Sequence, residues 1–320
     1  MKGEERAPLP IVPPPFPDER LTSWLERIAD VYLVSLDGLQ AHVGWVRPAL
    51  ELELEPVQAD MVRIAQATGC SLNRLLAMTF HGLPPRYRSL LRPEAREICL
   101  VCSRGMQRPQ RLRSWSFAFS FWCECHRQPL GNRDIRGAST LADSWTARRG
   151  AQILNAWAMG KDSAVVPVAS VLSLLLSLAR KASPAAPWEL ARLPPSCQRQ
   201  RSFQTKHFRR TVLTSVVPEF EVAVPIYDQR LPLDISKISI APRAERYALA
   251  IGVARVLKDP GSAIARILEF SDEQGREKIR TLIDLWPAPI CSAVRLHRTC
   301  NSKRGRDDRK NDRVQIYRPT

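Results

Sequence analysis

Apolar and polar positions repeat with the period of an α-helix over the first eighty residues. After Asp18 and Glu19, apolar side chains recur at helical spacing: Leu21, Trp24, Leu25, Ile28, Ala29 and Tyr32. Residues three and four apart share one face of a helix, so this pattern predicts an amphipathic helix. The proline-rich run before it cannot be helical, because proline fixes φ and removes the N–H donor. We therefore expect residues 1–20 to form an extended strap.

Three shorter helices are predicted after the first one. Ser35 and Ser71 are suitable N-caps for two of them. Pro56 is expected to start the helix between these two, and Gly69 to end it. Two short helices joined through a glycine resemble a helix-turn-helix, but such pairs are frequent in helical domains, so base reading is the less favoured interpretation. Residues 21–92 are thus predicted to form an N-terminal helical domain.

The second half of the chain is also predicted to be mainly helical. The expected helices are 151–159, 167–180, 243–257, 262–270 and 275–286, with Pro260 and Gly261 separating two of them. A proline-interrupted connector is expected over 184–195, and 212–240 is left unassigned between short strands and an irregular arm. The apolar run 165–179 is interpreted as a buried helix, since it is shorter than the ~20 residues that span a bilayer.

The predicted fold class is therefore mainly α. Its expected parts are the strap and the N-terminal helical domain, a zinc-binding basic module over 93–149, a mainly helical C-terminal domain over 150–300, and a basic flexible tail over 301–320. At 320 residues the chain is long enough for about two domains, each with its own core.

The positive net charge of the chain indicates the class of molecule that it binds. The chain carries a net charge of +16, and between Arg86 and Arg149 thirteen arginines face five acidic residues, which gives 13 − 5 = +8. An excess of this size attracts the phosphate backbone of nucleic acids, and the planar guanidinium fork suits phosphates and guanine edges. A merely solvated basic surface is the alternative interpretation.

Four residues in this basic region have the spacing of a zinc site. Cys99 and Cys102 form a Cys-x2-Cys pair, and Cys123 and His126 form a Cys-x2-His pair about twenty residues later. Two such turns can present four ligands to one tetrahedral Zn²⁺, and four protein ligands leave no position for a catalytic water. The pattern predicts a structural zinc site. Cys125 could replace Cys123, but adjacent residues seldom bind one ion from a tight turn, and two buried cysteine pairs without metal are the alternative.

An aromatic segment lies between the two cysteine pairs. Apolar and small residues alternate from Trp115 to Phe121, which predicts a strand or a short extended segment. The aromatic residues could stack on bases, but a small core beside the metal is the favoured interpretation.

The remaining cysteines and histidines indicate less. Cys291, His297 and Cys300 lack a convincing fourth ligand for a second zinc site. The paired cysteines and the absence of a secretory leader favour the reducing cytoplasm over a disulfide scaffold.

No phosphate-binding loop, dinucleotide motif, zinc-protease motif or nucleophile elbow is present, so we expect no catalytic residues and no enzyme activity.

Several short motifs in their order resemble the TniQ/TnsD family of transposition target-selection proteins. The likeness extends from Leu9 to Leu130 and includes the proline-rich entry, the segment Glu19-Arg20-Leu21-Thr22-Ser23-Trp24-Leu25-Glu26-Arg27-Ile28-Ala29, both cysteine pairs, and Gln128-Pro129-Leu130. Leu100 stands where the family commonly has a proline, and residues 131–140 lack the further cysteine pair that many members carry.

The resemblance implies a non-catalytic adaptor. Such proteins bind double-stranded DNA or a guide complex and recruit an AAA+ ATPase regulator, which delivers the transposase. We expect Arg104, Arg108, Arg111 and Arg113 to contact DNA phosphates. We expect no membrane partner. The oligomeric state is left open, and a homodimer is one of the options. A zinc-containing DNA-binding transcriptional regulator and a helical protein-interaction scaffold are the alternatives.

Overall fold

A computed structural model describes residues 7–290, except 85–87, 93, 95–96, 107, 132–140, 142, 162–163, 230–233, 285 and 289. The second cysteine–histidine set, Cys291, His297 and Cys300, and the tail 301–320 lie outside the described residues. The chain divides into two compact units. Unit 1 comprises residues up to 136 together with 158–160 and 236–240, and unit 2 comprises the rest.

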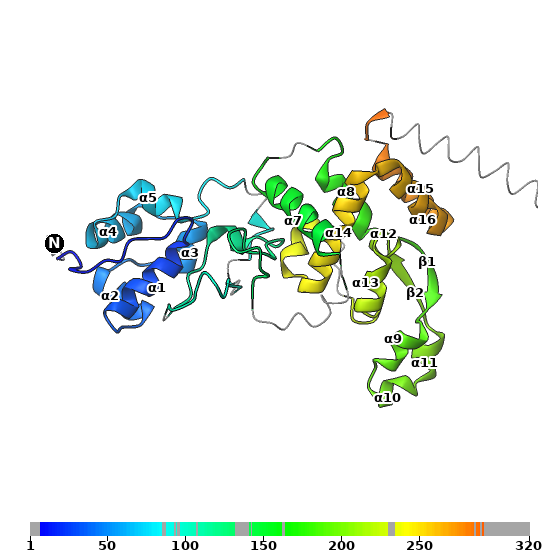
Figure 1. Ribbon diagram of the computed structural model, residues 1–320, viewed down its shortest axis with the longest axis horizontal. Helices are drawn as coiled ribbons and strands as arrows, with labels where there is room; N and C mark the ends of the chain where they lie inside the picture. The colour runs from blue at the N-terminus through cyan, green and yellow to red at the C-terminus, as the bar shows by residue number, and fades with distance from the viewer. Residues whose placement is uncertain are drawn as a thin grey trace, which may run out of the picture. The chain divides into compact units, whose positions relative to one another are not determined.

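Unit 1 begins with five α-helices (Figure 1). They are α1 Leu21–Val31, α2 Leu36–Val43, α3 Ala49–Leu54, α4 Gln58–Thr68 and α5 Leu72–Ala77. The Ser35 side chain accepts the Gly38 N–H, and the Ser71 side chain accepts the Arg74 N–H, so both predicted caps are confirmed. Gly69 ends α4 in the left-handed conformation at φ 67°, which glycine adopts without a steric penalty.

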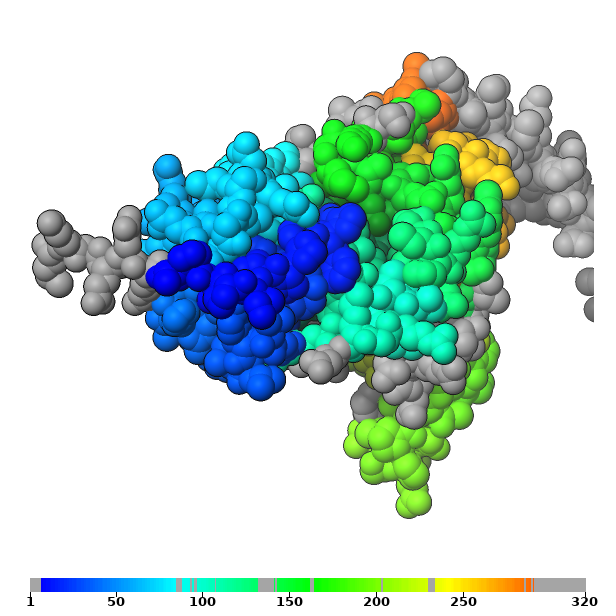
Figure 2. Space-filling view, turned by 60° about the vertical axis from the view of Figure 1, so that its left-hand side comes forward, coloured from blue at the N-terminus to red at the C-terminus, as the bar shows by residue number. Residues whose placement is uncertain are grey.

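The apolar face of α1 forms the centre of the first core. Leu21, Trp24 and Ile28 have no exposed surface, and they pack with residues of α2, α3, α4 and α5. The N-terminal segment lies over the outside of these helices (dark blue in Figure 2) and is held by the indole of Trp24, which donates to the Pro13 carbonyl at 2.8 Å. The extended strap predicted from the prolines is therefore observed over its described part.

A buried ion pair joins α1 to α3. The Glu53 carboxylate accepts from Arg20 Nε at 3.0 Å, from Arg20 Nη2 at 2.5 Å and from the Thr22 N–H at 2.7 Å. Both side chains are almost fully buried, at 2% and 0% exposure. Since α1 has no side-chain cap of its own, Glu53 supplies the acceptor that the start of the helix needs.

The segment 111–130 completes unit 1 and differs from its prediction. Arg113–Ser116 form a short 3₁₀ helix, η1, and only isolated bridges, such as Leu91 to Phe117, replace the expected strand. The alternation arises because this turn and the extended residues after it place the rings at the alternating positions 115, 117, 119 and 121 inward. Trp115, Phe117, Phe119 and Phe121 are at most 6% exposed, so the described rings form a core rather than an open stacking platform.

Unit 2 is also mainly helical, so the predicted mainly α class is confirmed (Figure 1). Its longer helices are α7 Ser144–Ala158, α8 Val168–Leu176, α14 Arg243–Lys258, α15 Pro260–Phe270 and α16 Glu273–Ile283. Short helices lie between them: α9 Pro187–Ala191, α10 Pro195–Gln198, α11 Arg201–Thr205, α12 Leu213–Val216 and α13 Pro218–Ala223. The 3₁₀ helix η2 Ile235–Ile240 belongs to unit 1 except for its first residue.

Two strands were not predicted. Strands β1 Leu178–Pro184 and β2 His207–Thr211 pair antiparallel, with Leu178 opposite Thr211 and Pro184 opposite His207. The helix expected over 167–180 therefore ends at Leu176. The predicted start of the next-to-last helix at Ser262 was also wrong, because α15 begins at Pro260 and its cap is Asp259, which accepts the Ser262 N–H.

The core of unit 2 centres on α8 and α14. Six of the nine residues of α8 are buried, and the interior stretch of α14 is buried on all sides, as expected of a helix that is apolar around its circumference. The interpretation of 165–179 as a largely buried helix is correct up to Leu176. None of the helices within the described part of the chain combines the length and the apolar content that crossing a bilayer requires.

Candidate metal centre

The four predicted ligands converge in unit 1. The Cys102 Sγ lies 3.2 Å from His126 Nδ1 and 3.6 Å from Cys123 Sγ. The Cys99 Sγ lies 3.6 Å from His126 Nδ1, and all four ligand atoms are within 4.8 Å of one another. Residues separated by more than twenty positions in the sequence therefore present three sulfurs and one imidazole nitrogen to a common point.

Local backbone structure explains this convergence. In the first turn the Ser103 N–H donates to the Cys99 carbonyl, and in the second the Arg127 N–H donates to the Cys123 carbonyl. Each turn thereby folds its two ligands to the same side. The second turn closes through Arg127 at φ 52°, a left-handed conformation that is uncommon for a residue with a Cβ. The Cys123 N–H to Gln128 carbonyl bond, at 2.8 Å, closes the loop around it.

The spacing of the four atoms fits a tetrahedral metal ion. Zinc binds sulfur at about 2.3 Å and nitrogen at about 2.0 Å, which at tetrahedral angles puts neighbouring ligand atoms about 3.5–3.8 Å apart. Separations of 3.2–3.7 Å for Cys99–His126, Cys102–His126, Cys123–His126 and Cys102–Cys123 are close to these values, and all the ligand atoms lie within 4.8 Å of one another. The cluster can therefore hold an ion of this size with little movement.

Two of the three clustered thiols, those of Cys102 and Cys123, resist deprotonation. Burial and the adjacent sulfurs of Cys123 and Cys99 raise the pKa of Cys102 to about 12. Burial also raises the pKa of Cys123, whereas for Cys99 hydrogen bonds from the Cys102 and Val101 backbone outweigh burial and lower the pKa. Three thiolates at one point need a cation to offset their mutual repulsion, which is the role of a bound metal.

The surroundings of the cluster separate Cys123 from Cys125. Cys99 and Cys123 are at most 1% exposed and pack with Trp115 and Leu130 in a small core of their own. Cys125 is exposed and does not belong to the group of four. The preference for Cys123 over Cys125 as third ligand is therefore supported by the geometry.

Three of the four arginines expected at DNA make internal ion pairs. Arg108 Nε lies 3.0 Å from Asp30 Oδ1, Arg111 pairs with Glu26, and Arg113 Nε lies 3.2 Å from Asp18 Oδ1. The backbone adds to these contacts, because the Arg20 N–H donates to the Arg111 carbonyl and the Arg113 N–H to the Asp18 carbonyl. These arginines join the metal-binding segment to α1 and to the residues just before it.

The fourth arginine, Arg104, is different. Its side chain is exposed and has no hydrogen-bond or ion-pair partner among the described residues, and it follows Cys102 by two positions. Arg127, directly after His126, is exposed and unpaired in the same sense, and the sequence reasoning missed it. Its adjacency to a ligand was the signal that could have identified it. Each turn of the metal centre thus carries one uncompensated guanidinium.

The geometry defines a helical domain built together with a Cys₃His cluster that could hold a metal ion. Residues 10–130 match the TniQ family model, which confirms the resemblance seen in the sequence. The TniQ family is a family of transposition-associated adaptors. Comparison with curated proteins and with solved structures gave no significant match.

Proposed function

We propose that this protein is a non-catalytic, DNA-binding adaptor that selects target sites for transposition by recruiting an AAA+ ATPase regulator and, through it, a transposase. The TniQ domain over residues 10–130 carries the proposal. The net charge of +16 and the basic metal module support duplex DNA as a partner. A guide complex and a homodimer are further partners that the same role would accommodate, and the reducing cytoplasm is the compartment in which it would operate.

The proposed metal is a structural Zn²⁺ held by Cys99, Cys102, Cys123 and His126. Three sulfurs and one imidazole nitrogen are a typical ligand set for structural zinc, and the small core around them is too limited to fold without help. Bound zinc would supply charge neutralisation for the thiolates and fix the two turns. Four protein ligands would fill its coordination sphere, in keeping with an adaptor rather than an enzyme.

The proposed DNA contacts begin with Arg104 and Arg127. Both guanidinium groups are exposed and have no partner within the part of the chain that the structure describes, so phosphate binding would break no pair seen there. We propose that Arg108, Arg111 and Arg113 contribute to the same DNA-binding surface. Their charge is shared with Asp30, Glu26 and Asp18, which reduces what each can contribute to phosphate binding.

Salt-dependent DNA binding tests the proposal. We expect the wild-type chain to bind duplex DNA in fluorescence anisotropy, and R104A/R127A to reduce the slope of log K against log salt by up to about 2. A matched control is R63A/R88A, which removes two exposed arginines of unit 1 that are already paired with Asp60 and Glu55. That control should change the slope little.

The outcomes separate the candidate functions. No duplex affinity of the wild type at physiological salt would contradict the adaptor and favour the scaffold. Finding genes for a transposase and an AAA+ ATPase beside the coding region would support a role in transposition. The purified ATPase should then bind the chain in a pull-down. A regulated operon in their place would favour the transcriptional regulator.

A further inference from the structure

The connection between β1 and β2 is a small helical lobe in unit 2. Residues 185–206, here called the hairpin lobe, contain α9, α10 and α11, and they lie beyond the ends of the two strands (Figure 1). Figure 2 shows the lobe, in yellow-green, as a projection of this unit. A twenty-two-residue insertion at the end of a two-stranded hairpin has far more surface than the turn itself requires.

The exposed charge of the hairpin lobe is entirely positive. Arg192, Arg199, Arg201 and Lys206 are all exposed, whereas Glu189, the lobe's one acidic residue, is 1% exposed. The lobe thus presents four cations and no carboxylate to solvent. A solvated surface that has no binding role usually intersperses both signs of charge.

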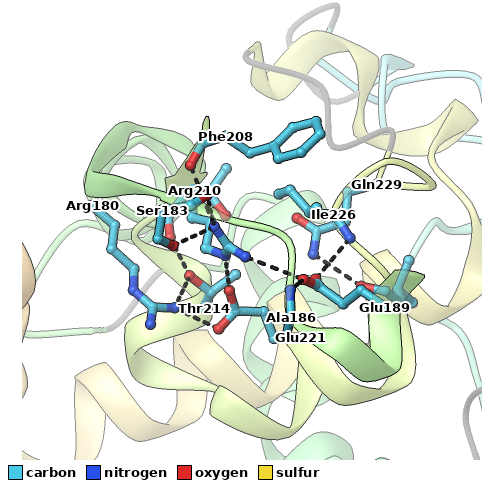
Figure 3. Close-up of polar contacts among 12 residues, drawn as sticks. Arg180, Ser183, Ala186, Glu189, Phe208, Arg210, Thr214, Glu221, Ile226 and Gln229 are labelled. Carbon is cyan, nitrogen blue, oxygen red and sulfur yellow. Dashed lines mark hydrogen bonds and ion pairs between the residues drawn. The ribbon is translucent and has the colours of Figure 1, made fainter. Parts of the chain in front are cut away.

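The one acidic side chain of the lobe, Glu189, is held in a buried polar network (Figure 3). Glu189 accepts the Ala186 N–H at 2.5 Å, the Ile226 N–H at 3.1 Å and Arg210 Nη2 at 3.3 Å. Arg210 is 3% exposed and also pairs with Glu221. The carboxylates of Glu189 and Glu221 are therefore both engaged in internal ion pairs at the base of the lobe.

The outer cations have almost no internal partners. Arg199 and Arg201 have no side-chain hydrogen bond or ion pair among the described residues. Arg192 donates only to a backbone carbonyl, that of Ala223 at 3.2 Å, and Lys206 Nζ lies over the Phe208 ring at 5.3 Å. By contrast, Arg209 on β2 is paired with Asp272 at 2.9 Å. Unlike Arg209, the cations of the lobe are therefore largely uncompensated among the described residues.

We infer that the hairpin lobe is a second duplex-DNA contact surface, which binds the phosphate backbone through Arg199, Arg201 and Lys206. The inference rests on the proposed DNA-binding role and extends it to a region outside the TniQ domain. Phosphate contacts position a protein on DNA without reading sequence, and clustered cations without carboxylates are what such contacts need.

An acidic protein surface is the less favoured partner. A protein interface has an apolar centre with a polar rim. Among the described side chains of the lobe, Trp188, at 51% exposure, is the one large apolar side chain in solvent. One tryptophan among four cations does not form such a centre, whereas it is compatible with contact to sugars or bases at a phosphate-binding surface.

The test compares two triple variants of the full chain. R199A/R201A/K206A removes three lobe cations, and K258A/R266A/K278A removes three exposed cations of unit 2 that also lack partners among the described residues. Each lost phosphate contact should reduce the slope of log K against log salt by about 0.9, so the lobe variant should lose up to about 2.7. The control, with the same net charge, should lose much less.

The outcomes distinguish this inference from the function on which it rests. If wild type and both triple variants bind DNA with the same slope, the lobe is not a DNA surface, although the adaptor proposal stands. If the lobe variant binds DNA normally but no longer binds the ATPase, the surface is for a protein and the inference is overturned. If the wild type does not bind duplex DNA at all, the proposed function itself fails. Circular dichroism should show both variants folded, since the substituted side chains are exposed.

Discussion

Replacing Glu53 by glutamine should strongly destabilise the N-terminal helices. The change keeps the size of the side chain but removes the charge that balances Arg20, and both side chains are inaccessible to solvent. Breaking a buried ion pair from one side typically costs about 3–5 kcal/mol, because the remaining charge is buried without compensation. A domain of this size is stable by about 5–15 kcal/mol in total, so the loss is a large part of it.

Hydrogen exchange is the suitable assay, since it reports on each unit separately. Loss of about 3–5 kcal/mol should accelerate the exchange of the most protected amides of α1 and α3 by roughly two to four orders of magnitude. Amides of α14 in unit 2 should not change. The control is Glu51→Gln, an exposed position on the same helix, where an effect within about 0.5 kcal/mol is expected.

The double variant R20M/E53L completes the design. Because much of the cost arises from the unpaired charge, replacing both residues by apolar ones should restore part of the protection. The remaining loss, about 1–3 kcal/mol, reflects the Thr22 N–H, which no longer has the Glu53 carboxylate as acceptor. If Glu53→Gln changes exchange in α1 by less than tenfold, the reasoning that this pair is essential to the packing of α1 on α3 is refuted.

Three further predictions follow from the structure. Chelation of the metal, or Cys102→Ser, should remove on the order of 10 kcal/mol of folding free energy from the metal-binding segment and abolish exchange protection there; unchanged protection would contradict a structural metal. Gly150→Ala should lower the melting temperature, because the added Cβ would lie 1.8 Å from the Ala250 carbonyl oxygen. We expect the variant to lose about 1–3 kcal/mol or more of stability. The control Gly38→Ala, whose Cβ would lie 3.4 Å from its nearest atom, should be neutral or stabilising. For Asp143, burial is outweighed by hydrogen bonds from Thr146 and the Arg255 guanidinium, which lower the pKa of the carboxyl below its ordinary 3.8. The free energy of unfolding that Asp143 contributes is therefore present above about pH 3.8 and is lost as the pH falls through the pKa of the folded state. Asp143→Asn should lower stability at neutral pH and flatten the acid limb of a pH–stability profile; an unaltered acid limb would show that this carboxylate is not responsible.

Local signals explain why the helices of the first core could be predicted. Ser35, Ser71 and Gly69 each act on a few neighbouring residues, so their effect can be read without knowing the tertiary structure. The convergence of Cys99 with Cys102, and of Cys123 with His126, was equally predictable, because the spacing within each turn is a local constraint. Only the closeness of the two pairs depends on the fold.

Other elements depend on tertiary contacts and were missed. Helix α3 alternates leucine and glutamate, which gave no helical period in the sequence, and it is stabilised by the burial of Leu52 and by the contacts of Glu53. Strand β1 follows an apolar helix without a glycine or proline between them, and its partner lies more than twenty residues further on. The partners of Arg108, Arg111 and Arg113 were likewise invisible, because their carboxylates lie about eighty or more residues away.

The pairs between the metal-binding segment and α1 have a consequence for synthesis of the chain. Helices α1–α5 leave the ribosome before Cys123 and His126 have been made, and at about 5–20 residues per second this delay is on the order of seconds. During that time Glu26 and Asp30 have no arginine to pair with, and the place of Arg111 beside Arg20 is empty. Capture of the proposed Zn²⁺ would then be the last step in the maturation of this segment and of the ion pairs that join it to α1, so that metal supply to the cell would limit how much finished protein accumulates.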